Sequence, residues 1–196
     1  MLVRQNLKAF SSRVDIIVTA CATCSMTIKK VWPSVMSDES STVKEAVHTL
    51  SGKLMDIVQF LAMGFARDVE KSRNVYQSSK TKVTYHDPCH LRKSLGIWKE
   101  PREILASLQE YEFVEMSEAD SCCGFGGSFA LKHGDISERI GDRKIGNIIQ
   151  TGAEIVSTAC PGCMLQIASG VSKAKASVQV KHIVELVANS QNYRWT

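Results

Sequence analysis

Short apolar runs alternate along the chain with longer segments in which apolar residues recur every three or four positions. Runs rich in β-branched residues predict strands, and the longer periodic segments predict amphipathic helices. The first strand is expected at 14–20, directly before Cys21, and later strands are expected at 83–86, 112–116, 154–159 and 178–182. Strands and helices therefore alternate from Val83 to the end of the chain.

The strongest helical pattern is an apolar stripe between Val43 and Phe65, which predicts one helix or two, with a break at Ser51-Gly52. A second long helix is expected from 135 to 150, where Asp135 can cap the first turn and Gly152 follows the last one. The side chains expected on its inner face are Ile136, Ile140, Ile145, Ile148 and Ile149. Shorter helices are predicted at 26–35, ending near Pro33, from Pro101 onwards, at 164–171 and from about 183 to 188.

Alternating strands and helices indicate an α/β fold, mainly a parallel sheet flanked by helices. Right-handed crossovers place every strand-to-helix loop at one edge of such a sheet, the carboxyl edge where α/β proteins bind ligands. Cys21, Cys89 and Cys160 each follow a predicted strand. The polar segment 73–82 is the best candidate for a linker between the first part of the chain and the rest. Three distant stretches of chain should thus carry sulfur to one edge.

Composition excludes several classes of protein. Of 196 residues, 44% are hydrophobic and 22% are charged, the balance of a chain that buries a core rather than remaining disordered. The net charge of +4 is small, and although the excess lies entirely in residues 1–80, it is too diffuse there for a nucleic-acid-binding surface. No run approaches the ~18 apolar residues of a membrane helix, and the first ten residues lack the apolar core of a signal peptide. A soluble, cytoplasmic protein without a transmembrane segment is expected.

Cysteine carries the candidate chemistry. The chain has seven cysteines, an odd number that does not suit a disulfide framework in a chain without a secretory signal. They are Cys21, Cys24, Cys89, Cys122, Cys123, Cys160 and Cys163, of which two pairs have C-x-x-C spacing and one pair is adjacent. Clustered cysteines are typical of thiolate ligands around a metal.

The last five cysteines follow the pattern C-x32-CC-x36-C-P-G-C. A C-x-x-C turn lets two sulfurs converge on one metal, and Pro161-Gly162 supplies the bend. Adjacent cysteines can face one site only in a turn, for which Gly124, Gly126 and Gly127 provide backbone freedom and amide donors. Five thiolates exceed the four of a tetrahedral zinc site or an ordinary cubane cluster, so an iron–sulfur assembly of another shape is a candidate.

These residues resemble the cysteine-rich CCG domain of the heterodisulfide reductases. The domain also occurs in the iron–sulfur subunits of glycolate oxidase, lactate-utilisation oxidoreductases and anaerobic glycerol-3-phosphate dehydrogenase. The segments YHDPCHLRKSLGI, EADSCCGFGGSF and GAEIVSTACPGCMLQIASG are most similar to the 2-hydroxy-acid oxidase branch, and the resemblance covers about residues 82–190. The segment TACATCSMTIKK matches only the closing C-x-x-C of a further such domain.

The resemblance implies two domains: residues 1–74 as the C-terminal part of a first CCG cysteine-rich domain and residues 82–196 as a complete second one. In a chain truncated in this way at its N-terminus, Cys21 and Cys24 belong to an incomplete first site. The second site is expected to hold a noncubane [4Fe-4S] cluster, with zinc as the alternative metal. The ligands that the resemblance implies are Cys89, Cys122, Cys123, Cys160 and Cys163.

Function follows from the same resemblance. It implies an electron-transfer subunit, not itself a flavoprotein, of a glycolate- or lactate-type oxidoreductase. Such a subunit takes electrons from a flavin-containing dehydrogenase subunit and, with other iron–sulfur subunits, passes them to a quinone or another carrier. The complex would be cytoplasmic, or held at the inner face of the membrane through its partners. Two alternatives remain: a zinc-stabilised interaction domain, and a heterodisulfide or thiol reductase that acts directly at the cluster.

Further candidates surround the five cysteines: His86, His90, Gly124, Gly126 and Gly162. The two histidines flank Cys89 and can tune the cluster, donate protons or ligate metal, or they only form hydrogen bonds within the loop. The glycines offer backbone N–H groups to sulfur. The other histidines, His48, His133 and His182, lie in no motif and are expected to be structural or exposed.

Overall fold

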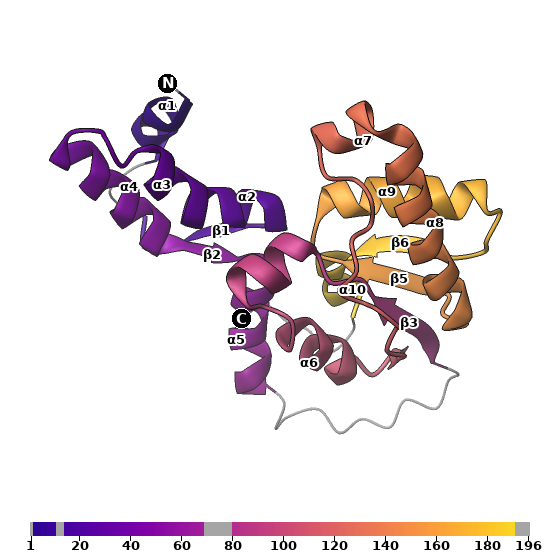
Figure 1. Ribbon diagram of the computed structural model, residues 1–196. Helices are drawn as coiled ribbons and strands as arrows, with labels where there is room; N and C mark the ends of the chain where they lie inside the picture. Colours follow the sequence, from indigo (N-terminus) through magenta and orange to yellow (C-terminus); the bar gives the residue numbers. More distant parts are fainter. Residues whose placement is uncertain (1, 11–13, 69–79, 191–196) are drawn as a thin grey trace.

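The computed structural model describes residues 2–10, 14–68 and 80–190, which form two β-sheets (Figure 1). The first sheet has the strand order β1-β2 and the second β4-β3-β5-β6, and the described strand pairs are all parallel. The expected α/β class is therefore confirmed. Most of the expected linker at 73–82 lies outside the described residues.

The first sheet joins β1 (Ile17–Thr19) to β2 (Leu54–Asp56). Its helical segments are α1 (Leu2–Ala9), α2 (Ala22–Met26), the π-helical turn η1 (Thr27–Val31), α3 (Trp32–Val35), α4 (Ser41–Lys53) and α5 (Ile57–Asp68). A continuous helical stretch thus begins four residues before the expected position 26. Pro33 lies within this stretch, in α3 directly after the π-helical turn, and the helix continues past it to Val35.

Strand β2 was not expected from the sequence. It divides the apolar stripe between α4 and α5, beyond the proposed break at Ser51-Gly52. Leu50, Leu54 and Leu61 are all buried and continue the spacing of a helix across the strand. The periodic pattern therefore hides a three-residue strand, because a segment so short contributes too few positions to change the period.

The second sheet begins with β3 (Thr81–Tyr85), which pairs with both β4 (Tyr111–Phe113) and β5 (Ile155–Thr158). The remaining elements are the π-helical turn η2 (His90–Ser94), α6 (Glu100–Ser107), α7 (Ser128–Lys132), α8 (Gly134–Gln150), α9 (Pro161–Lys173), β6 (Gln179–His182) and α10 (Ile183–Asn189). The strand order reverses at β3, so right-handed crossovers place α6 on one face and α8 and α9 on the other (Figure 1). The carboxyl ends of β3 and β5 therefore flank the topological switch point, where α/β sheets bind ligands.

One helix is rotated relative to the expectation. In α8, Ile145 and Ile148 are buried as expected, but Ile136 is 41% exposed and Ile149 is 46% exposed, so the prediction that both face inward was wrong. Helix α8 instead buries Ser137, Gly141 and Lys144 against its neighbours. Asp135 lies within the first turn instead of capping the helix, because α8 already begins at Gly134.

The two sheets meet near their carboxyl edges. The backbone N–H of Ala22, at the start of α2, donates to the carbonyl of Ala159 at the end of β5 over 3.2 Å. Ala22, Val58 and Leu61 belong to the same buried apolar cluster as the second sheet. Helix α5 lies beside α6 of the second sheet (Figure 1), and α2 contacts η2. Loops after β1 and β5 consequently face one another.

Candidate metal centre

Three loops place the five predicted cysteines at the switch point. Cys89 precedes η2 in the connection that follows β3, and Cys122 and Cys123 lie in the glycine-containing loop before α7. Cys160 is the N-cap residue of α9 directly after β5, and Cys163 lies in the first turn of that helix. The parallel sheet thus explains how residues far apart in sequence reach one place.

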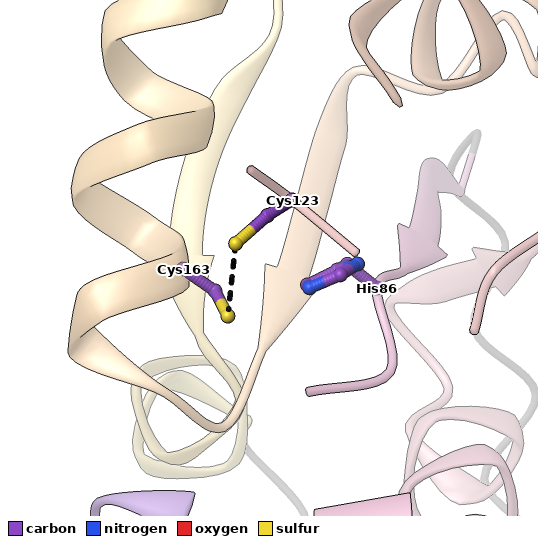
Figure 2. Close-up of side chains that lie close together, drawn as sticks. All are labelled: His86, Cys123 and Cys163. Carbon is purple, nitrogen blue, oxygen red and sulfur yellow. Dashed lines mark hydrogen bonds between the residues drawn. The ribbon is translucent and has the colours of Figure 1, made fainter. Parts of the chain in front are cut away.

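The five sulfurs form a continuous chain of contacts. The Sγ atoms of Cys123 and Cys163 are 3.4 Å apart, as the dashed line in Figure 2 marks. Cys122 hydrogen-bonds to both Cys89 and Cys123, and Cys160 hydrogen-bonds to Cys163. The structure therefore brings together all five cysteines that the sequence singled out, and all five are free thiols.

Left-handed glycines give the cysteine doublet its turn. The φ angles of Gly124, Gly126 and Gly127 are +94°, +55° and +58°, a region that other residues rarely adopt. At Gly124 a Cβ would also lie 2.4 Å from the carbonyl oxygen of Ser137. The loop packs against α8 so closely at this point that only glycine fits.

Backbone amides point at the sulfurs. The N–H of Gly124 donates to Cys122 Sγ over 3.3 Å. The N–H groups of Gly162 and Cys163, in the first turn of α9, donate to the sulfur of Cys160. The N–H of Phe125 donates to the sulfur of Cys123. Amide donors of this kind stabilise anionic sulfur and tune iron–sulfur centres. Gly126 has no such contact with sulfur among the described interactions, and its positive φ serves the turn instead.

Negative charge is distributed unevenly over the five sulfurs. A hydrogen bond from Cys163, helped by backbone amides, lowers the pKa of Cys160 to about 5. The pKa of Cys122 is lowered by hydrogen bonds from Cys123 and Cys89, whereas the hydrogen bond to Cys122 raises the pKa of Cys123 to about 11. Cys160 and Cys122 are thus the sulfurs that most readily carry negative charge, whereas Cys123 stays protonated more readily. All five sulfurs could be thiolates at the same time only with a cation among them to offset the charge.

His86 lies beside the sulfurs and is 1% exposed. One ring nitrogen of His86 and the Sγ atoms of Cys123 and Cys163 all lie within 4.8 Å of one another (Figure 2). Burial, followed by the nearby Lys144 cation, lowers the pKa of His86 to about 3, so its ring is neutral near pH 7. His90 on the other side of Cys89 instead pairs through Nδ1 with Thr23 Oγ1 at 3.0 Å.

Two buried charged groups near the site were missed by the sequence reasoning. Lys144 is 1% exposed, and its Nζ donates to the carbonyls of Glu118 over 2.6 Å and Ala119 over 3.3 Å. Asp87, also 1% exposed, accepts hydrogen bonds from both Arg92 and Arg102. These pairs fix the segments that lead into the doublet and into Cys89. A charged residue on a helix or in a loop is usually solvated, so the sequence offered no signal of its burial.

The first C-x-x-C pair lies next to the second. Cys21 caps α2 with φ −144° and ψ 109°, nearly the same backbone as Cys160 with φ −140° and ψ 114°. Burial raises the pKa of Cys21 to about 11, and the charge of Cys160 adds to the effect, while Cys24 is exposed. Thr23 lies between Cys21 and Cys24 in the sequence, and its Oγ1 is 3.7 Å from the Sγ of Cys160. The two motifs are thus neighbours with matching local geometry.

The remaining histidines differ in environment. His48 and His133 are exposed, and His182 caps α10 by accepting the N–H of Val184 over 3.3 Å. The ring of Phe125 packs directly against Gly162, where an added Cβ would lie 3.2 Å from the ring. These findings agree with the expectation of structural or exposed histidines.

A parallel α/β sheet with a group of thiols and a buried imidazole at its switch point defines a cysteine-rich metal-binding α/β protein. The chain belongs to the CCG cysteine-rich domain family, whose sequence profile matches residues 1–29 and 83–168. The first matched segment contains Cys21 and Cys24, and the second contains all five cysteines of the switch point.

Similar proteins are found in bacilli. Lactate utilization protein A of Geobacillus kaustophilus is 33% identical over 189 residues, which cover 96% of this chain and 75% of the relative. Lactate utilization protein A 2 of Bacillus cereus and lactate utilization protein A 1 of Bacillus anthracis are each 30% identical with the same coverage. No described helix is long and apolar enough to cross a membrane.

Proposed function

We propose that this chain is the iron–sulfur electron-transfer component of a 2-hydroxy-acid oxidoreductase of the lactate or glycolate type. Its centre would be held by the cysteines of the switch point, namely Cys89, Cys122, Cys123, Cys160 and Cys163. The observation that carries the proposal is the continuous contact of five sulfurs from three loops. The substrate class is taken from relatives that are named for lactate utilization.

The donor set suits an iron–sulfur cluster better than a single zinc ion. Zinc in structural sites takes four ligands, and this centre offers five sulfurs. Amides that donate to sulfur, as Gly124 does to Cys122, are typical of iron–sulfur proteins. A bound cluster would supply one-electron chemistry at a potential that these amides and the buried surroundings set. A noncubane [4Fe-4S] arrangement accommodates the fifth thiolate, and this is the form that we propose.

Partners follow from the chemistry of a relay. A centre that only takes up and releases electrons needs a donor that oxidises the hydroxy acid, so we propose a flavin-containing dehydrogenase subunit, with other iron–sulfur subunits alongside. A quinone or another carrier would accept the electrons downstream. Residues 1–74 would form the closing part of a first CCG domain, with Cys21 and Cys24 as part of its site, and residues 82–196 the second domain.

Metal analysis tests the proposal. The full chain, purified without oxygen, should be brown and contain roughly four irons with matching sulfide at the five-cysteine site. Cys122→Ser and Cys160→Ser should each remove more than half of this iron, because each cysteine belongs to the contacting set. Cys24→Ser is the matched control, since Cys24 is exposed and outside that set, and it should leave the iron nearly unchanged. A colourless protein with about one zinc, or unchanged iron in Cys160→Ser, contradicts the proposal.

A second candidate function has one observation in its favour. A hollow of about 310 Å³ opens beside the exposed Cys122 and is lined by Glu118, Asp120, Ser121, Ile140 and Arg143. A thiol or heterodisulfide reductase that works directly at the cluster needs room of this kind next to sulfur. Cleavage of a disulfide to two thiols takes two electrons and two protons, and one cluster supplies one electron. Two equivalents of the reduced wild-type protein should then convert one equivalent of a small disulfide into two thiols, with the protons taken from water. Failure to do so would leave the electron relay as the function.

A further inference from the structure

We propose that Thr23 is a positioning residue of the metal centre: its hydroxyl donates a hydrogen bond to the sulfur of Cys160 across the interface between the two sheets, and so sets the reduction potential of the centre. Thr23 belongs to α2, which follows the first sheet's β1, whereas Cys160 follows β5 of the second sheet. The inference rests on the proposed electron-transfer function and deepens it. It gives a part in that function to a residue that is not a ligand.

The hydroxyl of Thr23 lies between two polar groups of the second part of the chain. Its Oγ1 is 3.7 Å from the Sγ of Cys160 and 3.0 Å from the Nδ1 of His90. A thiolate bound to a metal has no hydrogen to donate, so in a loaded centre the hydroxyl is the donor and the sulfur is the acceptor. The hydroxyl has a single hydrogen, so His90 then donates from Nδ1 to Oγ1. These bonds form a short chain that ends on a ligand sulfur.

Metal binding increases the importance of the threonine. The pKa of Cys160 is lowered first by a hydrogen bond from the Cys163 thiol, to which backbone amides and Thr23 add. A metal displaces the proton of Cys163, so this first bond is lost when the centre is loaded. The donors that remain for the sulfur among the described residues are the N–H groups of Gly162 and Cys163 and the Thr23 hydroxyl. Of these donors, the hydroxyl is the one that a side-chain substitution removes.

Backbone contacts hold Thr23 in place. The preceding residue, Ala22, is fully buried, and its N–H donates to the carbonyl of Ala159 over 3.2 Å, directly before Cys160. Helix α2 also contacts η2, which begins with His90. Thr23 itself is exposed, so its side chain can be changed without disturbing the packed core.

The reduction potential tests the hydrogen bond. A donor to a ligand sulfur favours the reduced, more negative state of an iron–sulfur centre. The full chain is loaded without oxygen, and its midpoint potential is measured by redox titration followed by electron paramagnetic resonance. Thr23→Val keeps the shape of the side chain but removes the hydroxyl. At a fixed potential the ratio of reduced to oxidised centre should fall about threefold, which is about 28 mV for a one-electron couple.

Two further variants complete the test. Thr23→Ser keeps the hydroxyl and should restore the wild-type potential. Thr27→Val is the matched control at the start of η1, since the side chain of Thr27 has no contact with the five sulfurs among the described interactions. An unchanged potential in Thr23→Val, or an equal shift in Thr27→Val, overturns the inference. Loss of the iron from Thr23→Val overturns it as well, because the threonine would then be structural.

A metal probe separates this inference from the proposed function. Metal-free full chain is titrated with Co²⁺ alone, whose thiolate-to-metal charge-transfer bands move to lower energy when a ligand sulfur loses a hydrogen bond. Thr23→Val should move the bands in this direction, and Thr23→Ser and Thr27→Val should leave them in place. These shifts in a chain that takes up no iron support the hydrogen bond and contradict only the electron-transfer function. Identical bands in Thr23→Val and in a wild type that does carry iron contradict only the role of Thr23.

Discussion

At the scale of single residues, Gly124 has the least freedom to change. Its φ of +94° is unfavourable for other residues, and a Cβ would meet the carbonyl oxygen of Ser137 at 2.4 Å. Gly146 lies in helix α8, against which the loop of Gly124 packs, but a Cβ added at Gly146 would have no atom within 4 Å. The two glycines therefore form a matched pair for substitution.

We expect Gly124→Ala to displace the cysteine doublet, to reduce the bound metal by more than half and to lower the free energy of unfolding by about 3 kcal/mol, because strain and overpacking add. Gly146→Ala should leave the metal unchanged and stabilise the protein by about 0.5–1 kcal/mol, since alanine is favoured in helices. Metal analysis and urea unfolding of both variants provide the measurements. Full metal in Gly124→Ala would show that the loop can move away from α8.

Single residues also mark the limit of prediction from sequence. The cysteines can be found because their spacing has few uses, and the left-handed glycines because they follow a doublet that must turn. Lys144 and Arg102 give no such signal, since each resembles an ordinary solvated side chain until the fold surrounds it. In the sequence His86 stands out only as a histidine near Cys89, and its burial beside Cys123 and Cys163 is visible only in three dimensions.

At the scale of elements, helix α8 holds the segment that enters the doublet. Lys144 reaches from the helix to the carbonyl of Glu118, a non-glycine residue with a φ of +52°. Burial lowers the pKa of this lysine, so its charge is maintained only because carbonyl oxygens and nearby carboxylates surround it. The left-handed residue and the buried ammonium thus depend on each other.

Lys144→Met should lower the free energy of unfolding by about 2 kcal/mol, since the methionine fills the space but leaves the carbonyls without their charged donor. Lys173→Met on α9 removes an exposed ion pair to Glu138 and should leave the free energy of unfolding nearly unchanged, because solvent screens such a pair. Urea unfolding of the two variants under the same conditions makes the comparison. Equal stability of both would mean that the cost of burying the ammonium cancels its hydrogen bonds.

Elements were predicted well where their period was clear. The strands of the second sheet and the long helix α8 were expected close to their observed bounds. Strand β2 was hidden within an apolar stripe. The predicted buried face of α8 was partly wrong because isoleucines occupy two sides of the helix. A hydrophobic pattern does not decide which side packs when small residues, here Gly141 and Ser137, allow the closest approach.

At the scale of the whole molecule, Ala22 links the two sheets. It is fully buried, and its N–H donates to Ala159 beside the second C-x-x-C motif. The sequence predicted that cysteines from both parts would reach one edge, but not that the two edges would face each other. Such an arrangement depends on contacts between distant segments, which local patterns do not specify.

Ala22→Leu should force the sheets apart and lower the free energy of unfolding by about 1–3 kcal/mol through overpacking. Hydrogen exchange should quicken at the start of α2 and in η2, which contacts it. Ala106→Leu, at an exposed position of α6, should have little effect on either quantity. Equal exchange in the two variants would mean that the contact between the sheets adapts without loss.

The uneven exposure of the five sulfurs has a consequence for the survival of the protein in air. Cys122 is exposed, whereas Cys123, Cys160 and Cys163 are buried. Oxygen, peroxide and alkylating reagents therefore reach the group from one side, and they meet the thiol that most readily carries negative charge first. Oxidation should begin at the Cys122 thiol and then reach the buried sulfurs, so the lifetime of the centre in air depends on how well this one sulfur is shielded from solvent.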